Sequence, residues 1–300
     1  MKTKLILLIM SICACNSVSA QVFFKTEYFG MSSYRDSDNN KVGNSKGSAI
    51  VTQLGANIPL SVNTNERNQP TVWGLGINGA YASLNNKNFN HHLVLSEIYN
   101  ANVSLIHSRP LNDKWSLMAS VGIGIYAPRL SNLGFKNFLG SAGVLFTREI
   151  YPNLEVGIGL AINNTFGYPM IFPASYFSWI YDRKVVVNLS AFEGLEFSAG
   201  YNLTEFLFLG IIAEMNGQAA FVKKDGKDMI FSHQYNVFGG RAEIKFSKSF
   251  SLPITIGFHT ERLAYYDKRT LSAFFKTLGR DYDPSFKMSP DLSVGLKYGF

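Results

Sequence analysis

Apolar and polar side chains alternate with a period of two residues along much of this chain. In residues 115–126 the odd positions carry Trp, Leu, Ala, Val, Ile and Ile, whereas the even positions carry Ser, Met, Ser, Gly, Gly and Tyr. Successive side chains of a β-strand point to opposite faces, so this pattern predicts a strand with one apolar face and one small or polar face. A helix would need apolar residues three and four positions apart, which these segments do not show.

The same pattern recurs often enough to predict an all-β chain. Residues 206–215 are apolar on both faces except for Glu214, and residues 138–149 are mixed. The strand candidates are 22–33, 47–60, 71–83, 97–108, 114–126, 137–148, 154–164, 173–181, 184–191, 194–203, 205–215, 233–246, 252–265 and 289–300. The eighth and ninth are the least clear, so we expect about 12–14 strands.

The connections between these candidates alternate in length. Tight turns are expected near residues 112–114, 151–153, 182–183, 204–205 and 248–249. Longer polar loops are expected at residues 35–46, 85–97, 217–232 and 267–287. Short turns on one side and long loops on the other are typical of an antiparallel up-and-down transmembrane β-barrel. We find no linker and therefore expect one domain, residues 21–300.

The first twenty residues have the pattern of a secretory signal peptide. Two lysines precede an apolar run at residues 5–12, and Val18-Ser19-Ala20 is a small-residue cleavage site. Both cysteines, Cys13 and Cys15, lie in this segment, so the expected mature chain contains no disulfide or thiolate site. The alternative is a lipoprotein that carries a lipid on Cys15.

Composition supports a membrane barrel. Charged residues make up 16% and aromatic residues 14% of the chain, whereas about a quarter of a typical soluble domain is charged. The formal charge of +7 falls to +5 without Lys2 and Lys4, because 26 basic residues then face 21 acidic ones. The basic residues form no tract, so we expect no nucleic-acid partner. After the signal, no apolar run is long enough for a transmembrane helix.

The orientation of the two strand faces decides the class of protein. The polar faces are rich in Gly, Ser and Asn, which suits a hydrated interior, and the apolar faces end in aromatic residues such as Trp73, Trp115 and Tyr201. We therefore expect the apolar faces to contact lipid. A water-soluble β-sandwich, with the apolar faces buried, explains the alternation equally well but explains the low charge poorly.

The last nine residues, 292–300, carry a family resemblance. They resemble the closing strand of Gram-negative outer-membrane β-barrel proteins, and the mature chain resembles uncharacterised barrel families of similar length. The resemblance implies an outer-membrane location. It also implies that Leu296, Tyr298 and Phe300 form the signal that the barrel-assembly machinery reads.

Two motifs carry little weight. Gly74, Gly76 and Gly79 match GxGxxG, but they lie within an alternating strand and not between a strand and a helix, so no dinucleotide cofactor is expected. His91 and His92 are adjacent and would point to opposite faces of a strand, so no metal site is expected.

The most informative polar group lies on two consecutive strands near the C-terminus. By parity, its members all face away from the apolar side, and the tight turn between the strands makes them neighbours. They are Arg241, Glu243, Lys245, His259 and Glu261. The favoured interpretation is a charge ladder that braces the wall. The alternatives are a constriction that selects solutes and a catalytic His259 that activates a serine for lipid acyl hydrolysis.

Three functions remain open at this point. The favoured hypothesis is a channel for small solutes with a narrow or plugged lumen. The second is an outer-membrane lipid-modifying enzyme, for which Ser272 and Ser293 are the candidate nucleophiles, although nothing in the sequence singles either out. The third is a structural or adhesive barrel whose long loops bind a partner. The sequence leans away from an enzyme.

Overall fold

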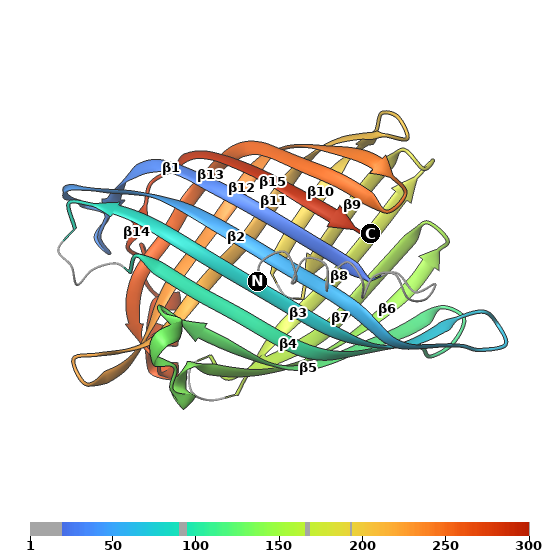
Figure 1. The fold of residues 1–300 in the computed structure, drawn as a ribbon, viewed down its shortest axis with the longest axis horizontal. Coiled ribbons are helices and arrows are strands. Elements are labelled where there is room, and N and C mark those ends of the chain that lie inside the picture. Colours follow the sequence, from blue (N-terminus) through green and yellow to red (C-terminus); the bar gives the residue numbers. More distant parts are fainter. Residues whose placement is uncertain (1–19, 90–94, 166–168, 193, 300) are drawn as a thin grey trace, which may run out of the picture.

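The protein is a closed antiparallel barrel (Figure 1). The computed structural model describes residues 20–89, 95–165, 169–192 and 194–299. Fourteen long strands in these ranges form one sheet, and β1 closes it by pairing with β15. The long strands are β1 (Gln21–Arg35), β2 (Lys41–Thr64), β3 (Pro70–Lys87), β4 (Glu97–Pro110), β5 (Trp115–Ala127), β6 (Phe138–Tyr151), β7 (Leu154–Asn163), β8 (Met170–Tyr181), β9 (Val185–Ala191), β10 (Leu195–Asn202), β11 (Leu207–Lys224), β12 (Lys227–Ser247), β13 (Phe250–Lys268) and β15 (Ser289–Tyr298).

Each long strand pairs with the next one along the chain. The exception is the two-residue strand β14 (Ser285–Phe286), which pairs with both β1 and β13 next to the end of β15. Every expected segment is a strand, including the two least clear ones, which are β8 and β9. The prediction of an all-β up-and-down barrel is therefore confirmed, with the larger of the two expected strand numbers.

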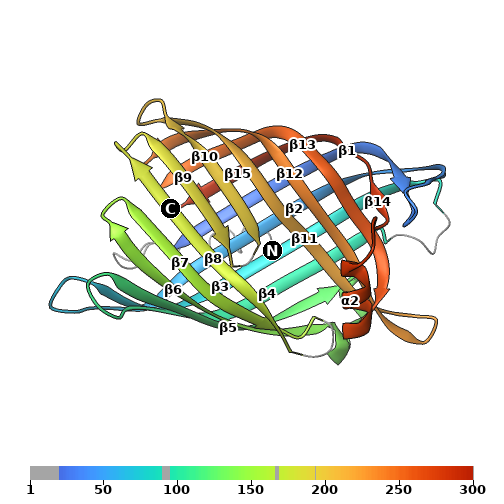
Figure 2. The same ribbon diagram turned by 180° about the vertical axis from the view of Figure 1, so that it is seen from behind.

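The two ends of the barrel differ in their connections. At one end, here called the turn end, short turns such as residues 152–153 and 248–249 join the strands. At the other end, the loop end, lie the longer connections 88–96, 128–137 and 269–284. This end also carries η1 (Leu130–Asn132), η2 (Phe135–Asn137) and α2 (Leu271–Leu278), as Figure 2 shows for α2. No helix within the described ranges is both long and apolar enough to cross a bilayer.

Two of the expected long loops are largely strand. Residues 41–46 of the loop expected at 35–46 belong to β2, which pairs with β1 as far as Arg35 and Lys41. Residues 217–232 belong to β11 and β12, which pair as far as Lys224 and Lys227. The turn consists of Asp225 and Gly226, whose φ angles of 50° and 75° suit a tight two-residue hairpin turn. The segment was expected to be a loop because it is polar. Strands that continue beyond the membrane need no apolar face, so polarity alone does not end them.

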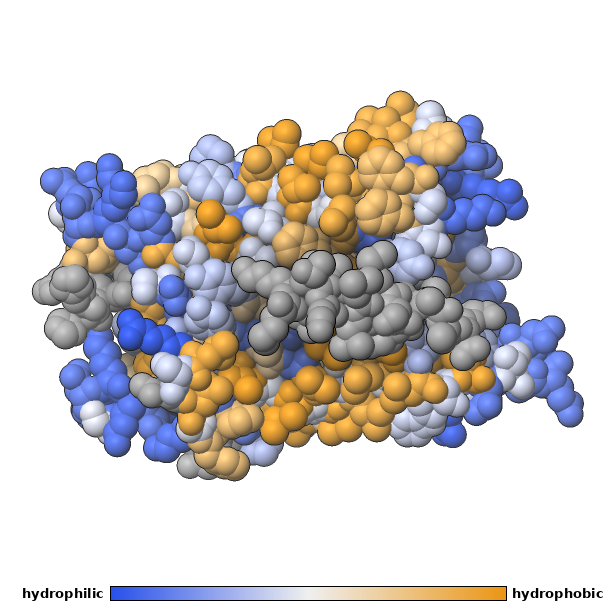
Figure 3. All heavy atoms as spheres, viewed as in Figure 1, coloured by the Kyte–Doolittle hydropathy of each residue, from blue (hydrophilic) through white to orange (hydrophobic). Residues whose placement is uncertain are grey.

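The apolar rows of the strands face outward. Ile158 is 73% and Ile256 68% exposed, whereas the intervening lumen-facing residues are mostly buried or half-buried. Figure 3 shows an apolar band between two hydrophilic ends. Exposed aromatic residues near the turn end include Trp73, Tyr201 and Tyr298. Because the strands of the described residues close into one barrel with their apolar rows on the exterior, the water-soluble sandwich is excluded, and the outer surface suits lipid.

The loop-end half of the interior holds a hydrophobic core, whose residues the sequence did not single out. Phe29, Phe231 and Phe286 are fully buried there, and Tyr34 donates a hydrogen bond of 2.8 Å to the carbonyl of Ala264. Side chains of residues far apart in the chain meet inside the closed wall. The lumen is therefore filled at this end and is not a continuous water-filled tube.

Candidate functional site: a charged lumen

A network of five charged side chains crosses the middle of the lumen. Lys25 Nζ lies 2.7 Å from Glu27 Oε1 and 2.5 Å from Glu214 Oε2. Arg241 Nη2 lies 2.5 Å from the other oxygen of Glu214, and its Nη1 lies 3.1 Å from Glu196. These residues come from β1, β10, β11 and β12, so the network joins strands that are not neighbours in the sheet. We call these five residues the central charge network.

Glu214 is the centre of the network. Its carboxylate is almost fully buried, and each of its oxygens accepts a charged hydrogen bond, from Lys25 and from Arg241. Arg241 is also held by Thr255, whose Oγ1 accepts from Nε at 3.1 Å. A buried charge costs several kcal/mol unless it is paired and hydrogen-bonded. The pairing fixes all three side chains in one arrangement.

A cavity borders this network on the side of the turn end. Its volume is about 300 Å³, which suits a small solute or a cluster of water molecules. Lys25, Glu196, Glu214, Arg241 and Lys297 contribute charged groups to its lining. Of these groups Glu196 is half exposed and Lys297 is partly exposed, so charges of both signs line the cavity.

Four of the five residues that the sequence grouped face the interior, but they do not form one cluster, and three of the four lie on β12. Arg241 belongs to the central charge network. Glu243 accepts a 2.6 Å hydrogen bond from Ser251 and lies 3.7 Å from Lys297. Lys245 donates to Asn202 Oδ1 at 2.9 Å. The last two lie nearer the turn end, where Glu243 links β12 to β13 and Lys245 links β12 to β10.

The prediction that Glu261 faces the lumen was wrong. The register between β12 and β13 shifts between Tyr235 and Val237, where two residues of β13, Thr260 and Glu261, lie opposite one residue of β12, Asn236. This β-bulge reverses the parity of the rest of β13. Glu261 is therefore exposed, and Arg262 is fully buried inside the barrel in its place.

His259 does lie inside and contacts a serine. Its Nε2 is 2.5 Å from Ser289 Oγ, which donates to the carbonyl of Gly30 at 2.8 Å. Because the serine proton is committed to that carbonyl, Nε2 is the donor in the first contact. A general base must accept the serine proton, so this arrangement is the reverse of an activated nucleophile. Neither Ser293, on the lumen face of β15, nor the exposed Ser272 of α2 is hydrogen-bonded to His259.

A second polar chain leads from the network toward the loop end. Tyr235 donates to Glu27 Oε2 at 3.1 Å, and Gln218 bonds to the same Tyr235 hydroxyl at 3.4 Å. Gln218 also contacts His233 Nδ1 at 2.8 Å, and His233 Nε2 lies 3.3 Å from Arg262 Nη1. The Arg262 guanidinium also stacks on the ring of Phe286, 3.9 Å from its centroid. The polar chain is thus enclosed by the hydrophobic core.

The sequence reasoning missed most of these residues, although a signal was present. Lys25 and Glu27 occupy alternate positions among the apolar residues of β1, and Glu214 is the one charge in an apolar stretch of β11. An isolated charge on the lumen side of a membrane strand needs a partner across the lumen. That rule would have identified these residues as candidates for the interior network, but it would not have predicted which residue pairs with which.

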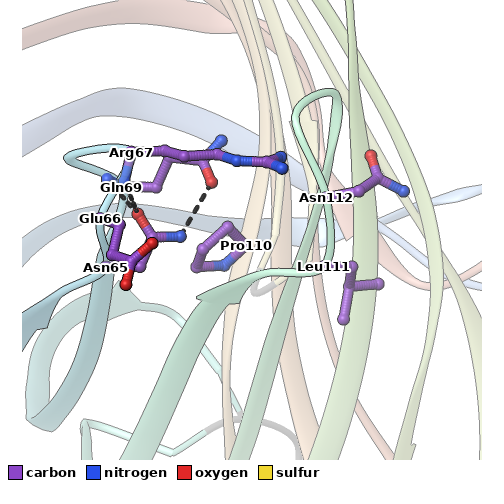
Figure 4. Close-up of a pocket in the computed structure, with 7 residues that line it drawn as sticks. All are labelled: Asn65, Glu66, Arg67, Gln69, Pro110, Leu111 and Asn112. Atoms are coloured by element: carbon purple, nitrogen blue, oxygen red, sulfur yellow. Dashed lines mark hydrogen bonds between the residues drawn. The ribbon is translucent and has the colours of Figure 1, made fainter.

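The remaining sequence motifs lie within β3 or outside the described residues. Gly74, Gly76 and Gly79 lie within β3, so they open no helix. His91 and His92 fall outside the described residues. Among the described residues, no three His, Cys, Asp or Glu side chains gather closely enough to hold a metal ion. A second hollow of about 290 Å³, lined by Asn65, Arg67 and their neighbours, lies on the surface between two turns at the turn end (Figure 4).

The predicted assembly signal lies on the strand that closes the barrel. Leu296 and Tyr298 are both exposed on the outer face of β15, which pairs with β1 and β13. Phe300 and the predicted signal peptide, apart from Ala20, lie outside the described residues.

An apolar exterior, a closed ladder of backbone hydrogen bonds and a charged interior define a transmembrane β-barrel. Residues 16–299 match the family described as "Domain of unknown function (DUF6268)". The chain belongs to that family, and no curated protein matches it.

Several solved barrels are similar in fold. An outer membrane channel from Pseudomonas putida F1 is 13% identical, with 95% of this chain and 97% of that chain covered and a TM-score of 0.48. The translocator domain of the autotransporter NalP from Neisseria meningitidis is 13% identical, with coverage of 100% and 95% and a TM-score of 0.38. A mutant of the TodX monoaromatic hydrocarbon channel is 9% identical, with coverage of 95% and 91% and a TM-score of 0.46.

Proposed function

We propose that this chain is an exported outer-membrane channel that admits small polar solutes to a charged lumen from its turn end. The observation that carries the proposal is the cavity of about 300 Å³ beside Lys25, Glu214 and Arg241. A barrel that served only as a membrane anchor would not need buried charges, since well-packed apolar residues stabilise a core equally well. A selective pore uses charged side chains arranged around a cavity of this kind.

The proposed orientation places the turn end in the periplasm and the loop end outside the cell. Short turns on the periplasmic side and longer loops outside are the rule for outer-membrane barrels. Solutes would then meet Glu196 and Lys297 first and the central charge network second.

Ion selectivity provides the test. Mature protein, residues 21–300, is reconstituted in planar bilayers with a KCl gradient, and the reversal potential is measured. Glu214→Gln removes a negative charge from the lumen and is expected to shift selectivity toward anions. Lys25→Gln is expected to shift selectivity toward cations. The matched control is Glu261→Gln, because the same change of charge on the exposed face of β13 leaves the lumen unaltered.

Opposite shifts in the two lumen variants, with no shift in the control, support the channel. A folded barrel that carries no current in any variant contradicts the channel. These variants include Asn100→Ala/Asn137→Ala and the reduced form of Lys136→Cys/Asp228→Cys. Lipid hydrolysis by that silent barrel would instead favour the enzyme, and loss of surface binding after loop deletion would favour the adhesive protein.

We further infer that the assembly machinery reads β15, because its outward row carries Leu296 and Tyr298 and the sequence after it ends in Phe300. Tyr298→Ser is expected to lower the folded fraction in the outer membrane, measured by heat-modifiable gel mobility. The control is Ser293→Ala, on the lumen face of the same strand. Equal folded fractions for both variants would contradict the inference.

A further inference from the structure

The part of β11 nearest the loop end has a strand partner on only one side. β10 pairs with β11 from Asn202–Phe208 to Leu195–Met215 and then ends. β11 continues from Asn216 to Lys224, paired with β12 alone. An unpaired strand edge exposes backbone donors and acceptors that must find other partners. Here this edge crosses the lumen and approaches β4, β5 and η2 on the opposite wall.

Two asparagine side chains satisfy this edge. Asn100 of β4 donates from Nδ2 to the carbonyl of Ala219 at 2.6 Å and accepts from its N–H at 3.1 Å. Asn137 of η2 donates to the carbonyl of Phe221 at 2.8 Å. Each amide replaces part of a missing neighbouring strand. We call this contact, between residues 216–222 of β11 and the opposite wall, the seam.

Apolar and cationic contacts complete the seam. Leu139 of β6, Phe221 of β11 and Ile230 of β12 form a small buried cluster. The guanidinium of Arg269 lies 3.7 Å from the centroid of the Phe221 ring. Arg269 also donates to the carbonyls of Lys136 at 2.6 Å and Thr165 at 3.0 Å. It therefore links the segment after β13 to η2 and to the segment after β7.

The seam differs from every other junction of the described wall. Neighbouring strands elsewhere are joined by ladders of backbone hydrogen bonds, whereas the seam is held by side-chain contacts. These are three hydrogen bonds to side-chain amides, one small apolar cluster, the contacts of Arg269 and the exposed ion pair of Lys136 with Asp228. Regions with few such bonds open at lower free energy than the rest of a structure. The closed seam separates the interior beside β4 and β5 from the solvent at the loop end.

We propose that the seam is the gate of the channel, and that Asn100 and Asn137 are the latches that hold it shut. This inference rests on the proposed function. Movement of the β11 edge away from β4 would also carry Phe231 of β12 away from Phe29 and thereby open the hydrophobic core. The turn-end cavity would then communicate with the loop end.

The test removes both latches. In Asn100→Ala/Asn137→Ala, each lost hydrogen bond is expected to change the open-to-closed ratio by roughly fivefold, so the three together give a change on the order of a hundredfold. Open probability in planar bilayers is the measurement. The matched control is Asn102→Ala, because Asn102 lies on the same face of β4 but makes no hydrogen bond to the described residues of β11. An unchanged open probability in a folded double variant overturns the gate.

A reversible lock tests the same idea without weakening the fold. Lys136 of η2 and Asp228 of β12 form an exposed ion pair with a distance of 2.6 Å across the seam. A short bis-methanethiosulfonate cross-linker, which joins the two thiols of Lys136→Cys/Asp228→Cys through reducible disulfides and spans the length of the lost lysine side chain, is expected to abolish openings, and reduction is expected to restore them. The mature chain holds no other cysteine, so each single-cysteine variant is the control.

The outcomes separate the gate from the channel. Current in the locked protein equal to that after reduction overturns the gate, while selectivity that follows the lumen charges leaves the channel intact. Absence of current in the wild type, the latch variant and the reduced lock overturns the channel itself.

Discussion

At the loop end of the lumen, Phe29, Phe231 and Phe286 are fully buried in one apolar cluster, whereas at the turn end Lys25, Glu214 and Arg241 border a cavity of about 300 Å³. The same fourteen strands build both regions. The loop-end half is packed with buried apolar side chains around a short polar chain. The turn-end half holds its shape by ion pairs and keeps space for solvent.

The difference shows how one wall can combine stability with access. Apolar packing inside a barrel contributes free energy in proportion to the area removed from water, and it closes the path through the lumen. Buried ion pairs contribute less net stability, but they hold charged groups at fixed positions beside open space. We therefore expect variants in the loop-end half to affect unfolding strongly and variants near the cavity to affect conduction.

The largest effect on stability is expected from Phe231→Ala. The side chain is fully buried, so its removal leaves a cavity that should cost about 3–5 kcal/mol of unfolding free energy. Urea unfolding in detergent micelles, followed by gel mobility, measures it. Phe238→Ala on the lipid face of the same strand is the control, because Phe238 is exposed. Equal losses in both variants would mean that the lumen is not a packed core.

The second-largest loss of unfolding free energy is expected from Glu214→Gln. Lys25 and Arg241 each lose one charged hydrogen bond but keep Glu27 and Glu196 as partners. The loss of unfolding free energy should be about 2–3 kcal/mol, accompanied by the change in selectivity proposed above. A stability loss without any change in selectivity would assign the network a bracing role alone.

A smaller effect is expected at a second contact across the lumen. A Cβ added at Gly143 of β6 would lie 2.6 Å from Cζ of Phe192, which follows β9. Gly143→Val should therefore displace the Phe192 ring and cost about 1–2 kcal/mol through overpacking. In Phe192→Ala/Gly143→Val most of this cost should disappear, because the clash is then absent. Unfolding of the single and double variants measures the coupling.

The smallest change in stability is expected from Lys297→Gln at the mouth of the cavity. Lys297 is partly exposed and lies 3.7 Å from Glu243, which is a weak ion pair. The unfolding free energy should change by no more than about 0.5 kcal/mol. Salt-dependent conductance should still respond, because the charge stands at the entrance. A stability loss comparable to that of Glu214→Gln would mean that Lys297 stabilises the barrel as much as the central charge network does.

The sequence by itself determined the strands and the face that each presents to lipid. Side-chain direction in a strand depends only on parity, so the alternation from Trp115 to Tyr126 is enough to predict which of its side chains face lipid. Even the least regular segments were found, because turn residues bound them. Parity failed at Glu261, since one extra residue in β13 reverses the pattern and nothing local marks the bulge.

Only the tertiary structure decided which lumen side chains meet. Lys25 and Glu214 are 189 residues apart and touch because the sheet closes and its strands are staggered around the barrel. The filled loop-end half and the seam have the same origin. Asn100 reaches Ala219 only because β10 ends early and leaves an edge of β11 facing across the lumen. These contacts depend on closure and stagger, which are properties of the whole barrel and of no single strand.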